Sequence, residues 1–121
     1  MNLKITPSKL SGTIAVPGSK SHTIRAVAMA MMAEGKSIIH APLISGDTLS
    51  AVRAAEAFGL KLERGDDSFW TAEGLGGNLM EPAGTIDMAN SGTSIKIFAA
   101  VSLPEYCFPE KVIILLAILS S

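Results

Sequence analysis

The chain has 121 residues, of which 48% are hydrophobic and 17% are charged, and its formal net charge is -1. This length suits one modest domain, and the near-neutral charge and few aromatic residues argue against a nucleic-acid surface or an anionic-membrane surface. The single cysteine, Cys107, excludes an internal disulfide and favours a reducing compartment. The longest apolar run, residues 112–119, is shorter than the roughly 20 residues of a membrane span, so a soluble cytoplasmic chain is expected.

The first predicted elements are a strand and a helix. Residues 11–18 alternate in polarity and then break at a Pro-Gly pair, which predicts a strand followed by a turn. Residues 20–34 carry apolar side chains at helical spacing and predict a helix. Ser19 or Ser21 is expected to cap this helix, and Gly35 to end it.

The rest of the chain repeats this kind of alternation. A short strand is expected over residues 36–43 and a second helix over 45–59, with Asp47 in its first turn. Residues 60–74 predict a hairpin, and residues 84–103 predict another strand, turn and helix. This order predicts an α/β (α+β) fold with helices packed on a sheet.

Two stretches of the sequence resemble each other. Residues 13–28, "TIAVPGSKSHTIRAVA", and residues 85–100, "TIDMANSGTSIKIFAA", both begin with Thr-Ile and continue through a small, polar turn. Each then places a cation early in the predicted helix, Arg25 in the first copy and Lys96 in the second. The pattern indicates a duplicated supersecondary unit.

The first of these turns has the composition of an anion site. A turn that enters a helix exposes unpaired N–H groups and the positive end of the helix dipole. Lys20 adds a mobile charge and Arg25 a planar fork, and Ser19, Ser21 and Thr23 add hydroxyl donors. The arrangement favours a small dianion, although a solvated lysine in an ordinary turn would have the same sequence.

The second turn strengthens the case for a phosphorylated or carboxylated metabolite. Ser91, Gly92 and Thr93 are small enough to let a ligand approach the backbone, and Lys96 takes the place of Arg25. Other candidates are weaker: His22, His40 and Cys107 have no expected partner, and Asp66-Asp67 suit a hairpin tip. Asp47 and Thr48 could face the first turn or only cap a helix, and the cap is favoured.

Three motifs together resemble the enolpyruvyl transferase family, and within it the EPSP synthases. They are "LSGTIAVPGSKS" from Leu10, "SGDT" from Ser45 with the "FG" that ends the following helix, and "IDMANSGTS" from Ile86. The related UDP-N-acetylglucosamine enolpyruvyl transferases usually have "SGAKN" where this chain has "PGSKS", so they are the alternative. A non-catalytic module that binds phosphorylated metabolites is a further alternative.

The resemblance implies transfer of the enolpyruvyl group from phosphoenolpyruvate to the 5-hydroxyl of shikimate 3-phosphate, with no cofactor or metal. It implies βαβαββ units in an incomplete inverse α/β barrel, the first over residues 13–82 and the second beginning at 83–103. It implies that Lys20 is catalytic and contacts both substrates. It further implies that Ser21 and Arg25 bind shikimate 3-phosphate, that Asn90 and Gly92 bind phosphoenolpyruvate, and that Asp47, Thr48, Thr93 and Lys96 support the site.

Two departures from the family bear on activity. The family usually has an arginine where this chain has Lys96, and the match fades so that residues 104–121 form an off-family tail. The family's "GD…RPM" segment, which supplies an arginine for phosphoenolpyruvate, does not follow. The chain is therefore expected to be a single truncated and inactive form of the enzyme, with a separately encoded remainder as one conceivable partner.

Overall fold

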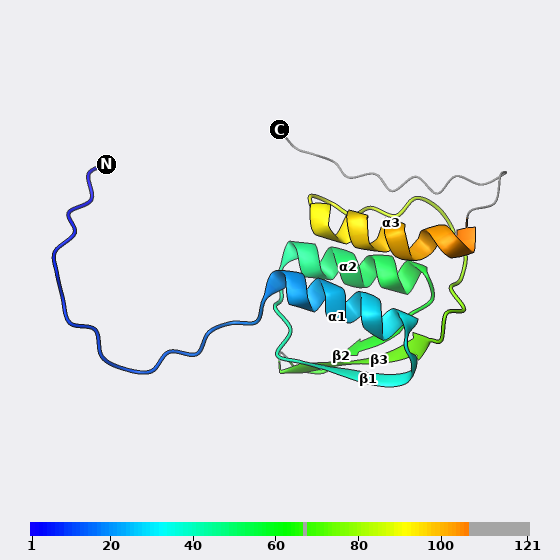
Figure 1. The fold of residues 1–121 in the computed structure, drawn as a ribbon, viewed down its shortest axis with the longest axis horizontal. Coiled ribbons are helices and arrows are strands. Elements are labelled where there is room, and N and C mark those ends of the chain that lie inside the picture. Colours follow the sequence, from blue (N-terminus) through cyan, green and yellow to red (C-terminus); the bar gives the residue numbers. More distant parts are fainter. Residues whose placement is uncertain (67, 107–121) are drawn as a thin grey trace.

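The computed structural model describes residues 1–66 and 68–106, and these form three helices and a three-stranded sheet (Figure 1). The elements in chain order are α1 (Lys20–Met32), β1 (Glu34–His40), α2 (Gly46–Ala57), β2 (Lys61–Arg64), β3 (Phe69–Leu75) and α3 (Gly92–Tyr106). The expected α/β (α+β) class is confirmed. Residues 104–106 belong to the end of α3, whereas Cys107 and the apolar run 112–119 lie outside the described residues.

The sheet is antiparallel throughout, in the order β1-β3-β2. Strands β2 and β3 form the predicted hairpin, and Ile39 pairs with Trp70 across β1 and β3. Ile39 and Trp70 are both buried, whereas Ile38, one residue away, is exposed. Because side chains alternate between the faces of a strand, one face of the sheet supports the helices and the other faces water.

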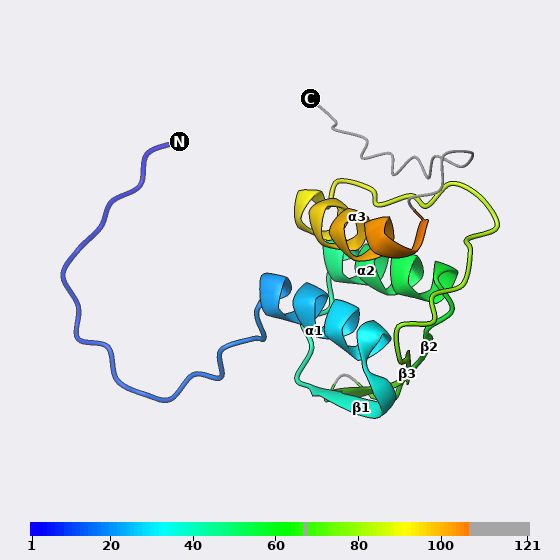
Figure 2. The same ribbon diagram turned by 45° about the vertical axis from the view of Figure 1, so that its right-hand side comes forward.

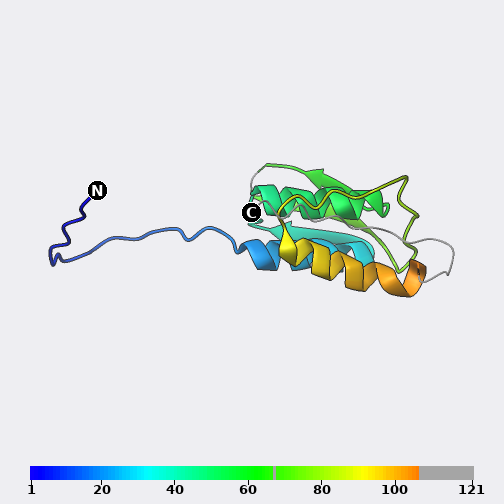
Figure 3. The ribbon, with the colours of Figure 1, turned by 90° about the horizontal axis from the view of Figure 1, so that it is seen from above.

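The helices form two further layers above the sheet. α1 and α2 pack on the strands, and α3 packs on α1 and α2 without reaching the sheet. The three helices run side by side in the same direction, so that all three begin at the same end of the molecule (Figures 1 and 3). This common end is where the sequence places most of its candidate site residues.

The core lies between the sheet and the helices and within the helix layers. Trp70 of β3 is buried on the face of the sheet that the helices cover. Phe58 and Phe98 are buried where the end of α2 packs on α3. The rings of Phe58 and Phe98 are stacked, with centroids 6.5 Å apart and planes inclined by 4°. Stacked aromatic pairs of this kind fix the position of α3 relative to α2.

A glycine brings α1 close to the sheet. A Cβ atom added at Gly74 would lie 2.1 Å from the carbonyl oxygen of Ala33 and 2.6 Å from that of Ala30. Only a residue without a side chain leaves room for the last turn of α1 there. The end of α1 therefore rests directly on the backbone of β3.

Three predictions about the elements are wrong. Residues 11–17 are exposed and belong to a segment, residues 1–17, that extends away from the packed elements (Figure 2). Residues 84–91 form no strand either, apart from an isolated β-bridge at Asp87. A strand needs a hydrogen-bonded neighbour, and no strand of the described chain pairs with either segment. Gly35 does not end α1, because the helix stops at Met32 and Gly35 already pairs with Gly74 in the sheet.

Candidate anion-binding site

A serine caps each of the three helices. The hydroxyl oxygen of Ser19 accepts a hydrogen bond from the His22 N–H at 3.4 Å, and that of Ser45 accepts one from the Thr48 N–H at 3.3 Å. The hydroxyl oxygen of Ser91 accepts one from the Ser94 N–H at 3.2 Å. Each cap leaves other N–H groups of the first turn unpaired within the helix. Three helix starts therefore contribute positive potential at one end of the molecule.

The first candidate turn is linked to the start of α2 by an ion pair. Lys20 Nζ lies 2.8 Å from Asp47 Oδ2, and the side chains are 49% and 28% exposed. Asp47 is in the first turn of α2, as predicted, but it does not cap the helix. It faces Lys20, so the interpretation of Asp47 as a cap is wrong. The pair holds the Lys20 ammonium group between two helix starts.

Thr48 has a different role from its neighbour. Its hydroxyl oxygen accepts a hydrogen bond from the Ser45 N–H at 2.9 Å and completes a capping box with Ser45. Its side chain is fully buried. The interpretation of Thr48 as a cap is confirmed, and a supporting role would act through the position of α2.

Thr23 ties the start of α1 to the loop before α2. Its hydroxyl donates to the Ser19 carbonyl at 2.9 Å and accepts from the Leu43 N–H at 3.0 Å. The side chain is buried, so the expectation that Thr23 donates to a ligand is wrong. Gly18 packs beside the same loop, since a Cβ atom there would lie 2.3 Å from the Ala41 carbonyl oxygen. Sequence analysis missed this junction, because a threonine in a first helical turn carries no signal for a partner 20 residues away.

The second candidate turn is built from serine hydroxyls and small residues. The Ser91 hydroxyl donates to Ser94 Oγ at 2.6 Å, and both side chains are buried. Asn90 and Gly92 are exposed at the start of α3, and Thr93 is half-buried. A Cβ atom at Gly92 would meet no atom of the described residues within 4 Å, which leaves room for a ligand beside this part of the chain.

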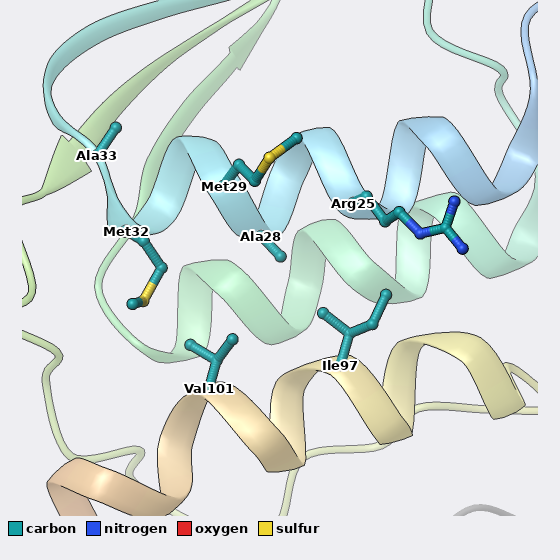
Figure 4. A pocket seen from close by; sticks show the side chains of 7 residues that line it. All are labelled: Arg25, Ala28, Met29, Met32, Ala33, Ile97 and Val101. Atoms are coloured by element: carbon teal, nitrogen blue, oxygen red, sulfur yellow. The ribbon is translucent and has the colours of Figure 1, made fainter.

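Arg25 and Lys96 occupy the second turns of α1 and α3, and both are exposed. Arg25 lines one end of a cavity of about 620 Å³ that runs between α1 and α3. Its aliphatic stem lies in this cavity, and its guanidinium group points toward the end where the helices begin (Figure 4). Ser21, four residues earlier, shares this face of α1 and is half-buried.

The structure therefore brings the predicted residues to one end of the helix layers. Lys20 and Asp47 are in direct contact, and the other members lie in or immediately before the first two turns of the same helices. Those other members are Ser21, Arg25, Thr48, Asn90, Gly92, Thr93 and Lys96. Their roles toward a ligand stay predictions.

The weaker candidates lie elsewhere. His22 and His40 are exposed. Asp66 accepts hydrogen bonds from the hydroxyl and the N–H of Ser68, and these bonds lower the pKa of its carboxyl group. Within residues 1–66 and 68–106, no three His, Cys, Asp or Glu side chains gather as metal ligands would. Asp67 lies outside the described residues.

None of the helices in the described part of the chain is both long enough and apolar enough to cross a membrane.

Comparisons with known proteins agree on one family. A family model described as EPSP synthase (3-phosphoshikimate 1-carboxyvinyltransferase) matches residues 5–107. The 3-phosphoshikimate 1-carboxyvinyltransferase of Acetivibrio thermocellus is 52% identical over 96 residues, which are 79% of this chain and 22% of that protein. The protein of the same name from Methanothermobacter thermautotrophicus is 45% identical over 103 residues, 84% of this chain and 24% of its own length.

Solved structures show the same likeness. An EPSP synthase from Acinetobacter baumannii superposes with a TM-score of 0.70 and 31% sequence identity. The match covers 74% of this chain and 21% of that structure. This chain thus spans between a fifth and a quarter of the length of these relatives, with 22% of the first and 24% of the second covered.

Proposed function

Because this chain belongs to the EPSP synthase (3-phosphoshikimate 1-carboxyvinyltransferase) family, we propose that its helix-start site serves the family's reaction in the shikimate pathway of aromatic amino acid biosynthesis. In that reaction the 5-hydroxyl oxygen of shikimate 3-phosphate forms a bond to the enol carbon of phosphoenolpyruvate, the bond from that carbon to the phosphate oxygen breaks, and the hydroxyl proton leaves with the phosphate. The products are the enolpyruvyl ether and inorganic phosphate.

The observation that carries the proposal is the position of Lys20. Its ammonium group is held between the starts of α1 and α2, at the end of the molecule where α3 also begins. Two anionic substrates repel each other, so a site that joins them needs preorganised positive charge. A lysine ammonium beside several helix N-termini supplies charge of that kind without a metal ion.

The resemblance to the family and this placement together support the proposed roles. Lys20 leaves Asp47 and pairs with a phosphate or carboxylate oxygen when substrate arrives, and Asp47 holds the ammonium group in place beforehand. Ser21 and Arg25, on one face of α1, bind the phosphate of shikimate 3-phosphate. Asn90 and Gly92 bind phosphoenolpyruvate at the open start of α3.

We further propose that the 121-residue chain is a truncated and inactive form that binds these substrates weakly. Among the described residues, the cations at this end of the molecule come from α1 and α3 only, so they compensate the charge of the substrates from one side. Lys96 also lacks the bidentate fork that an arginine would offer to a phosphate. A cytoplasmic location and a separately encoded remainder as partner stay predictions, the latter testable by genetic complementation of a strain without the enzyme.

A matched pair of lysine variants tests the proposal. We expect Lys20→Met to weaken binding of shikimate 3-phosphate by about tenfold or more in titration calorimetry, because a charge-assisted bond is lost. Lys36→Met, on an exposed strand position of β1, removes the same charge and should bind as the native chain does. Equal affinity of both variants would refute the assignment of Lys20.

Release of inorganic phosphate distinguishes an active enzyme from a chain that only binds the substrates. We expect the 121-residue chain to release phosphate from the two substrates far more slowly than a full-length relative. Binding without release supports the inactive form, and turnover at the rate of a full-length relative contradicts it. The relatives of this chain are named 3-phosphoshikimate 1-carboxyvinyltransferases, which gives no support to the UDP-N-acetylglucosamine alternative.

A further inference from the structure

The turn that carries Asn90 has an unusual backbone conformation. We call it the 88–91 turn; the Ser91 N–H donates to the Met88 carbonyl oxygen at 3.1 Å and closes it. Inside the turn, Ala89 has a φ of 47°, in the left-handed region that residues with a side chain rarely adopt. A backbone of this kind persists only where the surrounding structure fixes it.

Both ends of the 88–91 turn are fixed by burial. Met88 is fully buried, and Ser91 is buried with its hydroxyl bonded to Ser94. The two residues between these ends are less enclosed, since Ala89 is half-buried and Asn90 is exposed. Burial therefore anchors the ends of the turn, and the orientation of its middle depends on hydrogen bonds.

Asp87 supplies a hydrogen bond to the middle of the turn. Its Oδ1 accepts from the Ala89 N–H at 2.8 Å. Aspartate side chains commonly accept from the N–H two residues further on, and a charged acceptor makes a stronger bond than a neutral one. The bond orients the peptide group between Met88 and Ala89, directly before Asn90. The direction in which the chain presents Asn90 therefore depends on Asp87.

The negative charge of Asp87 argues against direct contact with an anionic substrate. Asp87 is exposed, and a carboxylate repels a phosphate or carboxylate group. It also lines a cavity of about 370 Å³ together with Arg53 of α2, so attraction to this arginine is the competing explanation for its presence. The two explanations differ in whether the hydrogen bond of Asp87 or its charge matters.

We propose that Asp87 is a positioning residue for Asn90 in the phosphoenolpyruvate site, an inference that rests on the proposed function of the start of α3. The carboxylate holds Ala89 in its left-handed conformation before the substrate arrives, so the turn does not have to become ordered on binding. Without this bond the turn adopts other conformations as well. The apparent affinity then falls in proportion to the fraction of molecules that keep the binding conformation.

Two variants of Asp87 separate its hydrogen bond from its charge. Asp87→Asn keeps an oxygen acceptor and removes the charge, whereas Asp87→Ala removes both. The Gly92 amide signal of the ¹⁵N-labelled full chain reports phosphoenolpyruvate binding. We expect Asp87→Ala to weaken this binding several-fold and Asp87→Asn to keep at least the native affinity. Shikimate 3-phosphate, followed at the Lys20 amide, is the control and should bind equally to all three chains.

Three results of these titrations would overturn the proposal. Native affinity for phosphoenolpyruvate in Asp87→Ala would show that the bond does not position the site. Equal weakening in Asp87→Ala and Asp87→Asn would assign the effect to charge, as attraction to Arg53 predicts. Equal loss of phosphoenolpyruvate and shikimate 3-phosphate binding in Asp87→Ala would show a general effect on the fold.

Hydrogen exchange at the Ala89 amide tests the hold of Asp87 on the turn without any ligand. We expect this amide to exchange several-fold faster in Asp87→Ala than in the native chain and in Asp87→Asn. Unchanged exchange in Asp87→Ala would overturn the proposal whatever the affinities are. The expected exchange, together with a native Gly92 signal that does not respond to phosphoenolpyruvate, would refute the proposed function of this helix start while supporting the hold of Asp87 on the turn.

Discussion

The starts of α1 and α3 share a sequence pattern and a serine cap, but they differ in what surrounds the cap. At α1, an ion pair and a buried threonine connect the turn to the loop and helix that follow β1. At α3, the Ser91 and Ser94 hydroxyls bond to each other inside the same turn, and Gly92 opens onto free space. The first start is tied to residues 20 and 27 positions away, whereas the Ser91–Ser94 hydrogen bonds of the second lie within its own turn. A duplicated motif can therefore serve two ligands.

Thr23→Val tests whether the longer-range hydrogen bond at the start of α1 stabilises the protein. We expect this variant to have the largest effect on the free energy of unfolding. The substitution leaves the Leu43 N–H without its partner in a partly buried place, so the free energy of unfolding should fall by about 1–3 kcal/mol. Ser94→Ala, the counterpart at α3, keeps the bond from the residue 94 N–H to Ser91 and should cost about 1 kcal/mol. Urea denaturation measures both. Equal costs for Ser94→Ala and Thr23→Val would show that the longer-range connection of Thr23 adds no stability beyond that of a bond within one turn.

Lys96→Arg tests whether the two helix starts differ in how their cations bind phosphate. An arginine at this position of α3 gains a planar fork for two phosphate oxygens, as Arg25 has in α1. We expect a several-fold gain in affinity for phosphoenolpyruvate, or about 1 kcal/mol, in titration calorimetry. Lys96→Gln, which removes the charge, should weaken the same binding. The proposed role of the second start fails if both variants bind phosphoenolpyruvate with the native affinity.

Asp47→Asn releases Lys20 from its partner. The carboxylate competes with an incoming anion, so its removal should strengthen phosphate binding by a few-fold. The exposed ion pair and the favourable position of Asp47 at a helix start together contribute less than about 1 kcal/mol to stability. Phosphate titration followed at the Lys20 amide signal measures the first effect. Weaker phosphate binding in this variant would show that Asp47 positions Lys20 more than it competes.

Ser68→Ala is the smallest change and lies remote from both helix starts. Loss of the Ser68 hydroxyl bond should raise the pKa of Asp66 toward its ordinary value. A carboxyl pKa that is lowered by folding stabilises the protein above the unfolded pKa, and this stabilisation is lost as pH falls through the folded pKa. A ¹³C carboxyl titration checks the direction. Anion binding at α1 and α3 should not change, and a change would imply a coupling that the structure does not explain.

Local patterns predicted much of the fold. The three helices, the strand after α1 and the hairpin follow from apolar spacing, and Ser19 follows from its place before a helix. The strand predicted over 11–18 is wrong, because alternation describes one strand while strand formation requires a neighbour. Gly35 was a reasonable helix stop, but pairing with Gly74 draws the chain into the sheet earlier.

The sequence predicts which residues make up the candidate site, but it does not predict which of them contact one another. Lys20 and Asp47 are 27 positions apart in the sequence, and only the parallel packing of α1 and α2 brings them together. Thr23 was expected to face a ligand, and its inward orientation depends on a loop N–H at Leu43. Propensities describe single elements, whereas these contacts depend on how elements pack.

The most direct measurement of the central claim is a map of amide shifts in the ¹⁵N-labelled full chain during titration with shikimate 3-phosphate. The account predicts that the largest shifts gather at the starts of the helices, at Lys20 and Ser21 in α1 and at Asp47 in α2. With phosphoenolpyruvate added, they should extend to Gly92 in α3. Shifts confined to the sheet, or scattered over the surface without these residues, would contradict it.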